Sequence, residues 1–354
     1  GGAAQRRVFL QSIRVCHRAR HAVNHVGIHS HTIWEYTMLP TQLLGRSGIE
    51  TTALGVGGHL GLLTDSNDPA QRRAEAIRAV RRATELGVRY FDTSPMYGGG
   101  ESELHLGAGL AALDGEMRAQ LTVSTKVGTH PDRPHAYGAD DVRWCYENSR
   151  QILGPIDIVF VHDPSSDADM DVIMGPGGAL EVLEELRMRG EIRAIGLGNR
   201  THRWQRHIID SGRADVILPS YDYHPIRQSM APLLDHAHAA NVGVVNGSPY
   251  QSGLLAGIDL EALAASQGEN PDIERARQIY AWCRAQNIEV GALAVQFSMR
   301  EPRISATLVG PRTVAELEDN LRHATASISE AQWATFAAFL ADLQPPAAPG
   351  GEAL

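Results

Sequence analysis

The sequence contains few cysteines, no surplus of positive charge and no long hydrophobic run. Its three cysteines, Cys16, Cys145 and Cys283, lie far apart in 354 residues and match neither a metal-ligand spacing nor a disulfide framework. We therefore expect no metal site and a reducing, cytoplasmic location. The formal net charge of −9 argues against a nucleic-acid-binding protein, which would carry a basic stripe. No apolar run approaches the length of a membrane span, so we expect no membrane partner. The expected partner is a small-molecule substrate.

The first part of the chain, residues 1–37, differs from the rest in its histidines. Most of them are four residues apart, which on a helix would place the imidazoles on one face and could hold a metal: His17, His21, His25, His29 and His31. Only Cys16 and Glu35 accompany them as other ligand types. We interpret residues 1–37 as a leader or extension outside the core.

From Met38 onward, short apolar runs alternate with longer amphipathic segments. A small hairpin is expected first, because Leu43 and Leu44 precede a glycine-containing turn at residues 45–48, and Ile49 and the stretch 51–56 follow it. Eight apolar runs have the length and composition of buried strands: Ala53–Val56, Val88–Phe91, Leu121–Ser124, Ile156–Val161, Ile192–Leu197, Val216–Leu218, Val242–Val245 and Ala306–Val309.

Segments with a 3.6-residue hydrophobic period separate these runs. They are Pro69–Leu86, Asp140–Leu153, Ala179–Arg189, His202–Ser211, Gln228–Ala240 and Ile273–Ala285. Strands that alternate with helices imply parallel pairing, and eight of them predict an α/β fold, a single (β/α)8 TIM barrel over residues 38–345 with an N-terminal β-hairpin and a flexible tail at 346–354. An open doubly wound sheet is the alternative, but no Gly-x-Gly-x-x-Gly follows the first strand. The pattern does not distinguish a monomer from an oligomer.

Reactive side chains follow three consecutive predicted strands. In a barrel, chemistry takes place at the C-terminal ends of the strands, where this chain has Asp92 and Tyr97, then Lys126, then His162. A lysine cation is expected to lower the pKa of a tyrosine toward a useful range, a carboxylate to pair with that lysine, and a histidine to orient a substrate oxygen.

Each of these residues also has an ordinary structural explanation. Alone, Asp92 could cap a turn, Lys126 could be an exposed strand end, His162 a structural histidine and Tyr97 a filler of the core or surface. All four at successive strand ends favour a catalytic group.

The same residues resemble the aldo-keto reductase superfamily. The match lies in Gly87–Gly98 with Glu101 and Leu106-Gly107, in Ser124-Thr125-Lys126, in Val161-His162 and in Leu308–Thr313. The resemblance covers roughly residues 39–340 and implies a catalytic tetrad of Asp92, Tyr97, Lys126 and His162. Tyr97 would then transfer the proton, while a hydride passes between a nicotinamide and the substrate carbon without a metal.

The resemblance also implies a cofactor, either NADP or NAD. Asn199 and Ser220 would hold the carboxamide, and a loop at 247–255 with Ser248, Pro249 and Gly253 would hold the pyrophosphate. Gly247 stands where many members have an aromatic residue that stacks on the nicotinamide. The adenosine end would meet the last loop and helix at Gly310, Arg312, Thr313, Glu316 and Asn320. Glu316 would repel a 2′-phosphate and favour NAD, whereas Arg312 could pair with that phosphate and favour NADP.

Within the superfamily, the chain looks like the branch of L-fucose, L-galactose and D-threo-aldose 1-dehydrogenases. This implies oxidation of an aldose at C1 to a lactone, with Tyr137, Asp163, Tyr223 and Asn246 as candidate sugar-binding residues. One alternative is an NADPH-dependent reductase of a ketone or aldehyde, such as a keto sugar or natural-product intermediate. Another is a nucleotide-sensing accessory subunit, which the complete tetrad disfavours.

Overall fold

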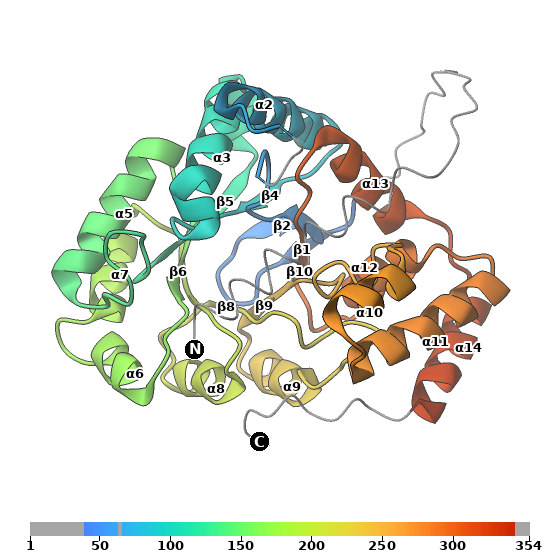
Figure 1. The fold of residues 1–354 in the computed structure, drawn as a ribbon. Helices are drawn as coiled ribbons and strands as arrows, with labels where there is room; N and C mark the ends of the chain where they lie inside the picture. The colour runs from blue at the N-terminus through green and yellow to red at the C-terminus, as the bar shows by residue number, and fades with distance from the viewer. Residues whose placement is uncertain (1–38, 63–65, 344–354) are drawn as a thin grey trace.

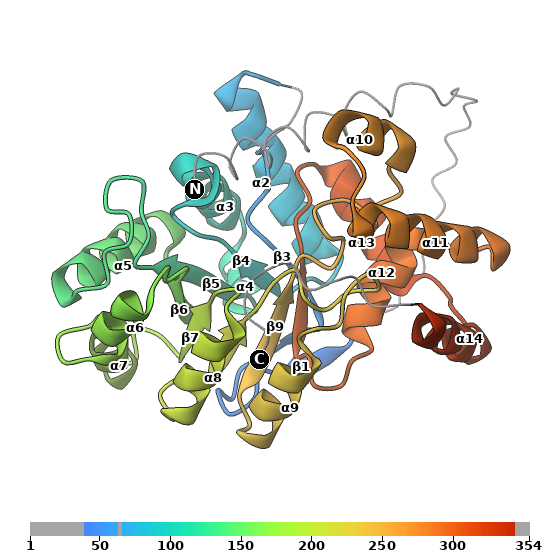
Figure 2. The same ribbon diagram turned by 60° about the horizontal axis from the view of Figure 1, so that its bottom comes forward.

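The predicted barrel is the observed fold. A computed structural model describes residues 39–62 and 66–343, so the histidines of 1–37 and the tail at 346–354 lie outside the described residues. Strands β3 to β10 form a closed barrel, and the helices surround it (Figures 1 and 2). Each neighbouring pair of barrel strands is parallel, and β10 closes the barrel against β3.

The barrel strands fall within two residues of the predicted runs at nearly every end. They are β3 (Leu54–Val56), β4 (Tyr90–Asp92), β5 (Thr122–Val127), β6 (Ile158–His162), β7 (Ala194–Gly198), β8 (Val216–Leu218), β9 (Gly243–Gly247) and β10 (Ala306–Val309). Strands buried on both faces read as continuous apolar runs, which is why their positions were predictable.

The predicted hairpin is also present, with β1 (Thr41–Leu43) antiparallel to β2 (Glu50–Thr52). Leu44 and Ile49, at its turn end, are fully buried and belong to the core cluster inside the barrel. Gly45 has a φ of 51°, and a Cβ there would lie 2.3 Å from the Gly243 nitrogen. The glycine therefore lets the hairpin approach the start of β9 and close one end of the barrel.

Helices follow the strands and cover the barrel. The six predicted ones are α2 (Pro69–Glu85), α5 (Ala139–Leu153), α7 (Ala179–Met188), α8 (His202–Asp210), α9 (Ala231–Ala239) and α11 (Pro271–Ala285). The sequence patterns did not predict α3 (Glu101–Ala111), α4 (Gly115–Ala119), α6 (Asp167–Met174), α10 (Leu260–Gln267), α12 (Val290–Met299), α13 (Val314–Thr325) or α14 (Glu330–Asp342). Helix α12 is buried at most positions, so it lacks the polar face that reveals a helical period.

Alternation along the strands decides which side chains enter the barrel. Tyr90, Ile158, Phe160 and Val245 belong to the inner cluster, whereas the residues between them pack against the helices. Because side chains alternate with a period of two, the next inward position on β4, β6 and β9 is Asp92, His162 and Gly247. The open end of the barrel is thus lined by the residues at the C-terminal ends of the strands.

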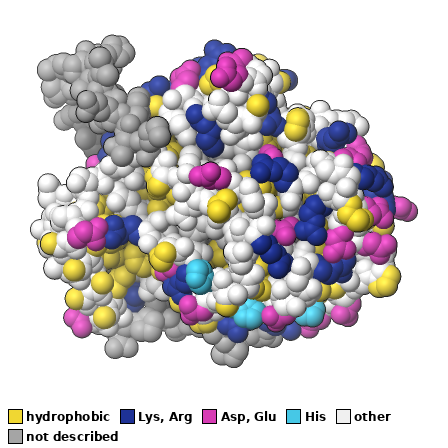
Figure 3. All heavy atoms as spheres, turned by 180° about the vertical axis from the view of Figure 1, so that it is seen from behind, with side chains coloured by type: hydrophobic (Ala, Val, Ile, Leu, Met, Phe, Trp, Pro, Cys, Tyr) yellow, Lys and Arg dark blue, Asp and Glu magenta, His cyan; other side chains and the backbone are white. Residues whose placement is uncertain are grey.

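The outer surface carries charges of both signs. Arginines pair with carboxylates on neighbouring helices, for example Arg82 of α2 with Glu318 of α13 and Arg143 of α5 with Glu185 of α7. In the face shown in Figure 3, basic and acidic side chains are intermixed. In the described ranges, no helix is long and apolar enough to cross a membrane.

Candidate active site

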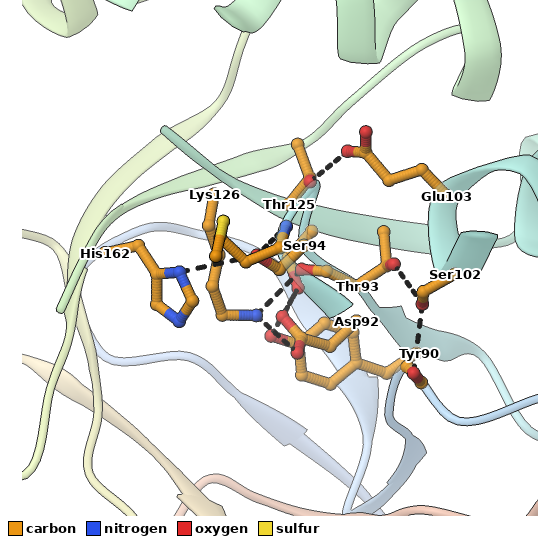
Figure 4. Close-up of polar contacts among 12 residues, drawn as sticks. Tyr90, Asp92, Thr93, Ser94, Ser102, Glu103, Thr125, Lys126 and His162 are labelled. Atoms are coloured by element: carbon orange, nitrogen blue, oxygen red, sulfur yellow. Dashed lines mark hydrogen bonds and ion pairs between the residues drawn. The ribbon is translucent and has the colours of Figure 1, made fainter. Parts of the chain in front are cut away.

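A buried ion pair joins the C-terminal ends of β4 and β5. Lys126 Nζ lies 2.7 Å from Asp92 Oδ2, and the two side chains are only 1% and 3% exposed. Lys126 also donates to the Thr93 carbonyl at 2.8 Å, and Ser124 donates to Asp92 Oδ1 at 2.6 Å (Figure 4). Buried charges are tolerated only when they are paired and hydrogen-bonded, so this network fixes the position of both groups.

Tyr97 lies beside this pair. It begins the short 3-10 turn η2 (Tyr97–Gly100), in which Gly98 and Gly99 have φ values of 61° and 68°. Lys126 Nζ is 4.7 Å from the centre of the Tyr97 ring, and the His162 ring meets the tyrosine edge-on at 5.7 Å. The four residues expected to form a tetrad are therefore brought together by β4, β5, β6 and one turn.

The electrostatics of Tyr97 differ from the expectation. Burial raises the pKa of Tyr97 well above its ordinary value, and the charges of Asp92 and Asp163 raise it further. The expected net lowering of this pKa is not found, because burial outweighs the effect of the cation and Asp92 pairs with Lys126 at 2.7 Å. At neutral pH the phenol is protonated.

His162 has a fixed orientation at the end of β6. Its Nδ1 lies 2.7 Å from the Thr129 hydroxyl and 3.3 Å from the Ser94 hydroxyl, while Nε2 lies 3.4 Å from Asp163 Oδ2. A carboxylate beside Nε2 favours the tautomer with the proton on that atom. Burial, with Lys126 as a smaller cause, holds the pKa of His162 well below its ordinary value, so the ring is neutral. A neutral Nε2–H can donate to a substrate oxygen.

Tyr137, a predicted sugar-binding residue, supports His162 instead. It is 3% exposed, and its hydroxyl donates to the His162 carbonyl at 2.8 Å. Gly128 makes room for the tyrosine, since a Cβ there would lie 2.3 Å from its ring. The side chain is buried under the site rather than open to a ligand.

Two other predicted sugar-binding residues face away from the barrel interior. Asn246 is fully buried, and its Nδ2 donates to the Ser298 hydroxyl of α12 at 2.7 Å. Tyr223 stacks on Phe297, and its hydroxyl donates to Glu301 at 2.6 Å. These two predictions were wrong: Asn246 alternates with the inward Val245 and Gly247 and so points outward.

Asp163, another candidate sugar-binding residue, lies at the open end of the barrel. It follows His162 with a φ of 43°, a strained value for this residue type, and its amide donates to the Gly198 carbonyl at 2.9 Å. Its side chain is 59% exposed. The carboxylate is thus held beside His162 and open to a ligand.

The opposite side of the opening is lined by small residues. Gly198 ends β7, Ser220 follows β8, and Gly247 ends β9. A Cβ at Gly198 would make only ordinary contacts, 3.7 Å from Lys126 and 3.8 Å from His162, so this glycine lies directly beside the tetrad. Glycine at a strand end often marks a place where a ligand approaches the backbone closely, so these small residues suit a flat ring such as a nicotinamide. Asn199 is partly occupied, because its Oδ1 accepts from Thr201 and its Nδ2 donates to the Pro164 carbonyl.

The loop after β9 contains several residues with positive φ. Ser248, Gln251, Ser252 and Gly253 all have positive φ values, between 47° and 96°. Left-handed residues turn backbone N–H groups toward a common side and form concave anion sites. The predicted contacts Ser248, Pro249 and Gly253 lie in this loop, which fits a pyrophosphate.

The predicted adenosine end contains a tight ion pair. Arg312 and Glu316 are joined by several hydrogen bonds, with Arg312 Nε 3.0 Å from both carboxylate oxygens. Thr313 caps α13, and Glu75 accepts from the Val314 amide at 2.8 Å. The guanidinium that could bind a 2′-phosphate therefore already has a carboxylate partner. Gly310, which precedes this group, lies against His59, and Asn320, further along α13, is buried.

Sequence reasoning missed two aromatic side chains at the opening. The His59 ring stacks on Tyr97, with centres 6.2 Å apart and 21° between the planes. Tyr221 follows Ser220 and has a φ of 68°. Both follow barrel strands, β3 and β8, so applying the strand-end rule to all eight strands would have found them.

Comparison with known proteins agrees with this arrangement. The chain is 30% identical to L-galactose dehydrogenase of Arabidopsis thaliana over 82% of this chain and 89% of that protein. It is also 30% identical to D-threo-aldose 1-dehydrogenase of a Pseudomonas species, over 74% and 87%. The holo form of an aldo-keto reductase from Bacillus halodurans, AKR11C1, has the same fold, with a TM-score of 0.70, 19% identity, and coverage of 85% of this chain and 96% of that one. Residues 54–341 match the aldo/keto reductase family, and the chain is an oxidoreductase of that family.

Proposed function

We propose that the protein oxidises an aldose at C1 to the lactone, with NAD+ as the hydride acceptor. The observation that carries the proposal is the buried Lys126–Asp92 pair beside Tyr97, with the neutral His162 on its other side. When bound, the nicotinamide accepts the hydride from C1. Tyr97 takes the proton of the C1 hydroxyl, and His162 Nε2–H donates to the same oxygen, so loss of the hydride and the proton leaves a C=O bond.

A sugar is supported by the polar groups at the opening. Asp163 offers an exposed carboxylate beside His162, which suits adjacent hydroxyls as donors. The relatives at 30% identity include enzymes named for L-galactose and D-threo-aldoses. A polyhydroxylated substrate with a free anomeric hydroxyl fits both observations.

NAD is preferred over NADP in this proposal because of charge at the adenosine end. A 2′-phosphate would have to displace Glu316 from Arg312, and Glu75 adds a second carboxylate nearby. Like charges at these distances disfavour the phosphate, whereas a ribose hydroxyl could donate to Glu316.

A second candidate is NADPH-dependent reduction of a ketone or aldehyde. It is favoured by the raised pKa of Tyr97, because a protonated phenol is ready to donate to a carbonyl oxygen at neutral pH. In the oxidising direction the same shift makes the phenolate scarce, so oxidation should speed up as the pH rises.

Purified protein incubated with a panel of aldoses and either NAD+ or NADP+ tests the proposal. We expect reduced nicotinamide to form with at least one aldose, faster with NAD+ than with NADP+ and faster at pH 9 than at pH 7, by about tenfold per pH unit while the phenolate is the minor form. Inactivity on every aldose, together with rapid NADPH-dependent reduction of aldehydes, would instead establish the second candidate.

A further inference from the structure

Tyr221 has a strained backbone that its neighbours hold in place. Its φ of 68° is costly for a residue with a Cβ. The Tyr221 amide donates to the Gly247 carbonyl at 3.3 Å, and its carbonyl accepts from the fully buried His224 at 2.9 Å. Hydrogen bonds to the amide and to the carbonyl hold Tyr221 in this strained conformation and so fix the direction of its side chain. Residues with such backbone strain cluster at ligand-binding sites.

The Tyr221 ring lies at the open end of the barrel with one face covered. The guanidinium of Arg200 lies 4.8 Å from the ring centre, and the same guanidinium is 3.9 Å from Asp222 Oδ1. Tyr221 is close enough to Tyr97 to raise the pKa of that phenol. The ring therefore lies at the same open end of the barrel as the tetrad, on the β7–β9 side.

Tyr221 also adjoins the small residues that line the opening beside the tetrad. Ser220 pairs with Gly247 across a parallel bridge, and a Cβ on Gly247 would approach the Ser220 Cβ to 3.0 Å. Gly247 is the position at which many members of the family have an aromatic residue, and here it has no side chain. Tyr221 follows the bridge partner of Gly247 by one residue, so its ring can reach the region that an aromatic side chain at Gly247 would occupy.

We propose that Tyr221 supplies the ring against which the nicotinamide end of the cofactor stacks, in place of a side chain at Gly247. The inference rests on the proposed use of a nicotinamide cofactor. Offset stacking of flat rings is favourable, and a tyrosine presents a rigid face at little entropic cost. Tyr221 thus acts as a positioning residue for the cofactor, and His224 and Arg200 hold it in place.

Binding measurements with two probes test this role without relying on turnover. NAD+ carries the nicotinamide, and ADP-ribose lacks it but keeps the rest of the dinucleotide. We expect Tyr221→Leu to weaken NAD+ binding by about tenfold and to leave the Kd for ADP-ribose within about twofold, whereas Tyr221→Phe, which keeps the ring, should bind both like the wild type.

Tyr223→Phe is the matched control, because it alters a tyrosine of the same loop that packs on Phe297 away from the opening. It should change neither Kd. Equal weakening of NAD+ and ADP-ribose by Tyr221→Leu would make Tyr221 a loop support and overturn the proposal. An unchanged NAD+ Kd with a raised KM for the sugar would assign the ring to the substrate and also overturn it. A wild type that binds neither probe would contradict the proposed function itself.

Discussion

The two sides of the barrel opening are built in opposite ways. On the β4–β6 side, Asp92, Lys126 and His162 are buried and have hydrogen-bond or ion-pair partners at 2.7 Å. On the β7–β9 side, the strand ends carry Gly198 and Gly247, and the loops contain strained residues such as Tyr221. The first side fixes charged groups for chemistry, whereas the second carries small side chains and positive-φ backbone, which suit a bound ligand. The comparison separates groups that set the rate from groups that set the affinity for the cofactor.

The largest expected effect comes from Tyr97 on the charged side. Tyr97→Phe removes the proton-transferring hydroxyl and keeps the ring, so we expect kcat to fall by about 10³-fold, within the range usual for a general acid or base. The Kd for NAD+ should stay within about twofold, because the comparison assigns affinity to the other side. Steady-state kinetics and a binding titration measure the two quantities; a variant that retains a tenth of the rate would remove Tyr97 from this role.

The next effect concerns stability. Asp92→Asn leaves the Lys126 cation buried without its carboxylate, so we expect the free energy of unfolding to fall by about 3–5 kcal/mol. The double variant Asp92→Asn/Lys126→Met, which removes the charge as well, should recover most of that loss while remaining inactive. On the open side, Ser220→Ala should change stability by no more than about 0.5 kcal/mol. Urea unfolding of the three variants measures these differences, and equal losses for Asp92→Asn and Ser220→Ala would break the comparison.

The smallest effect is expected at the adenosine end. Glu316→Gln removes the negative charge that pairs with the Arg312 guanidinium and would repel a 2′-phosphate, so the ratio of kcat/KM for NADP+ to that for NAD+ should rise by about tenfold. Glu318→Gln is the matched control, since it makes the same change on the same helix at a carboxylate that pairs with Arg82. If both variants shift the ratio equally, overall charge rather than the Arg312–Glu316 pair sets the preference.

The charged side of the opening was predictable from the sequence, and the open side was not. Buried apolar runs gave the strands, and Asp92, Lys126 and His162 stand at their ends with side chains whose chemistry is specific. Gly198, Ser220 and Gly247 carry no such chemistry, and the positive φ of Tyr221 leaves no mark in the sequence. Asn246 was misassigned because a polar residue at a strand end was taken as inward without counting the alternation from Val245. The pKa of Tyr97 depends on its burial and on the 2.7 Å pairing of Lys126 with Asp92, and neither can be derived from the sequence.

Transfer of a label from the sugar tests the central claim most directly. The protein is incubated with NAD+ and an aldose that carries deuterium at C1, and the reduced nicotinamide and the sugar product are analysed by mass spectrometry. The account predicts that the deuterium moves from C1 to the reduced nicotinamide, that the product is the unlabelled lactone, and that Tyr97→Phe loses nearly all of this transfer. Deuterium retained in the sugar product, or reduced nicotinamide that forms without the label, would contradict it.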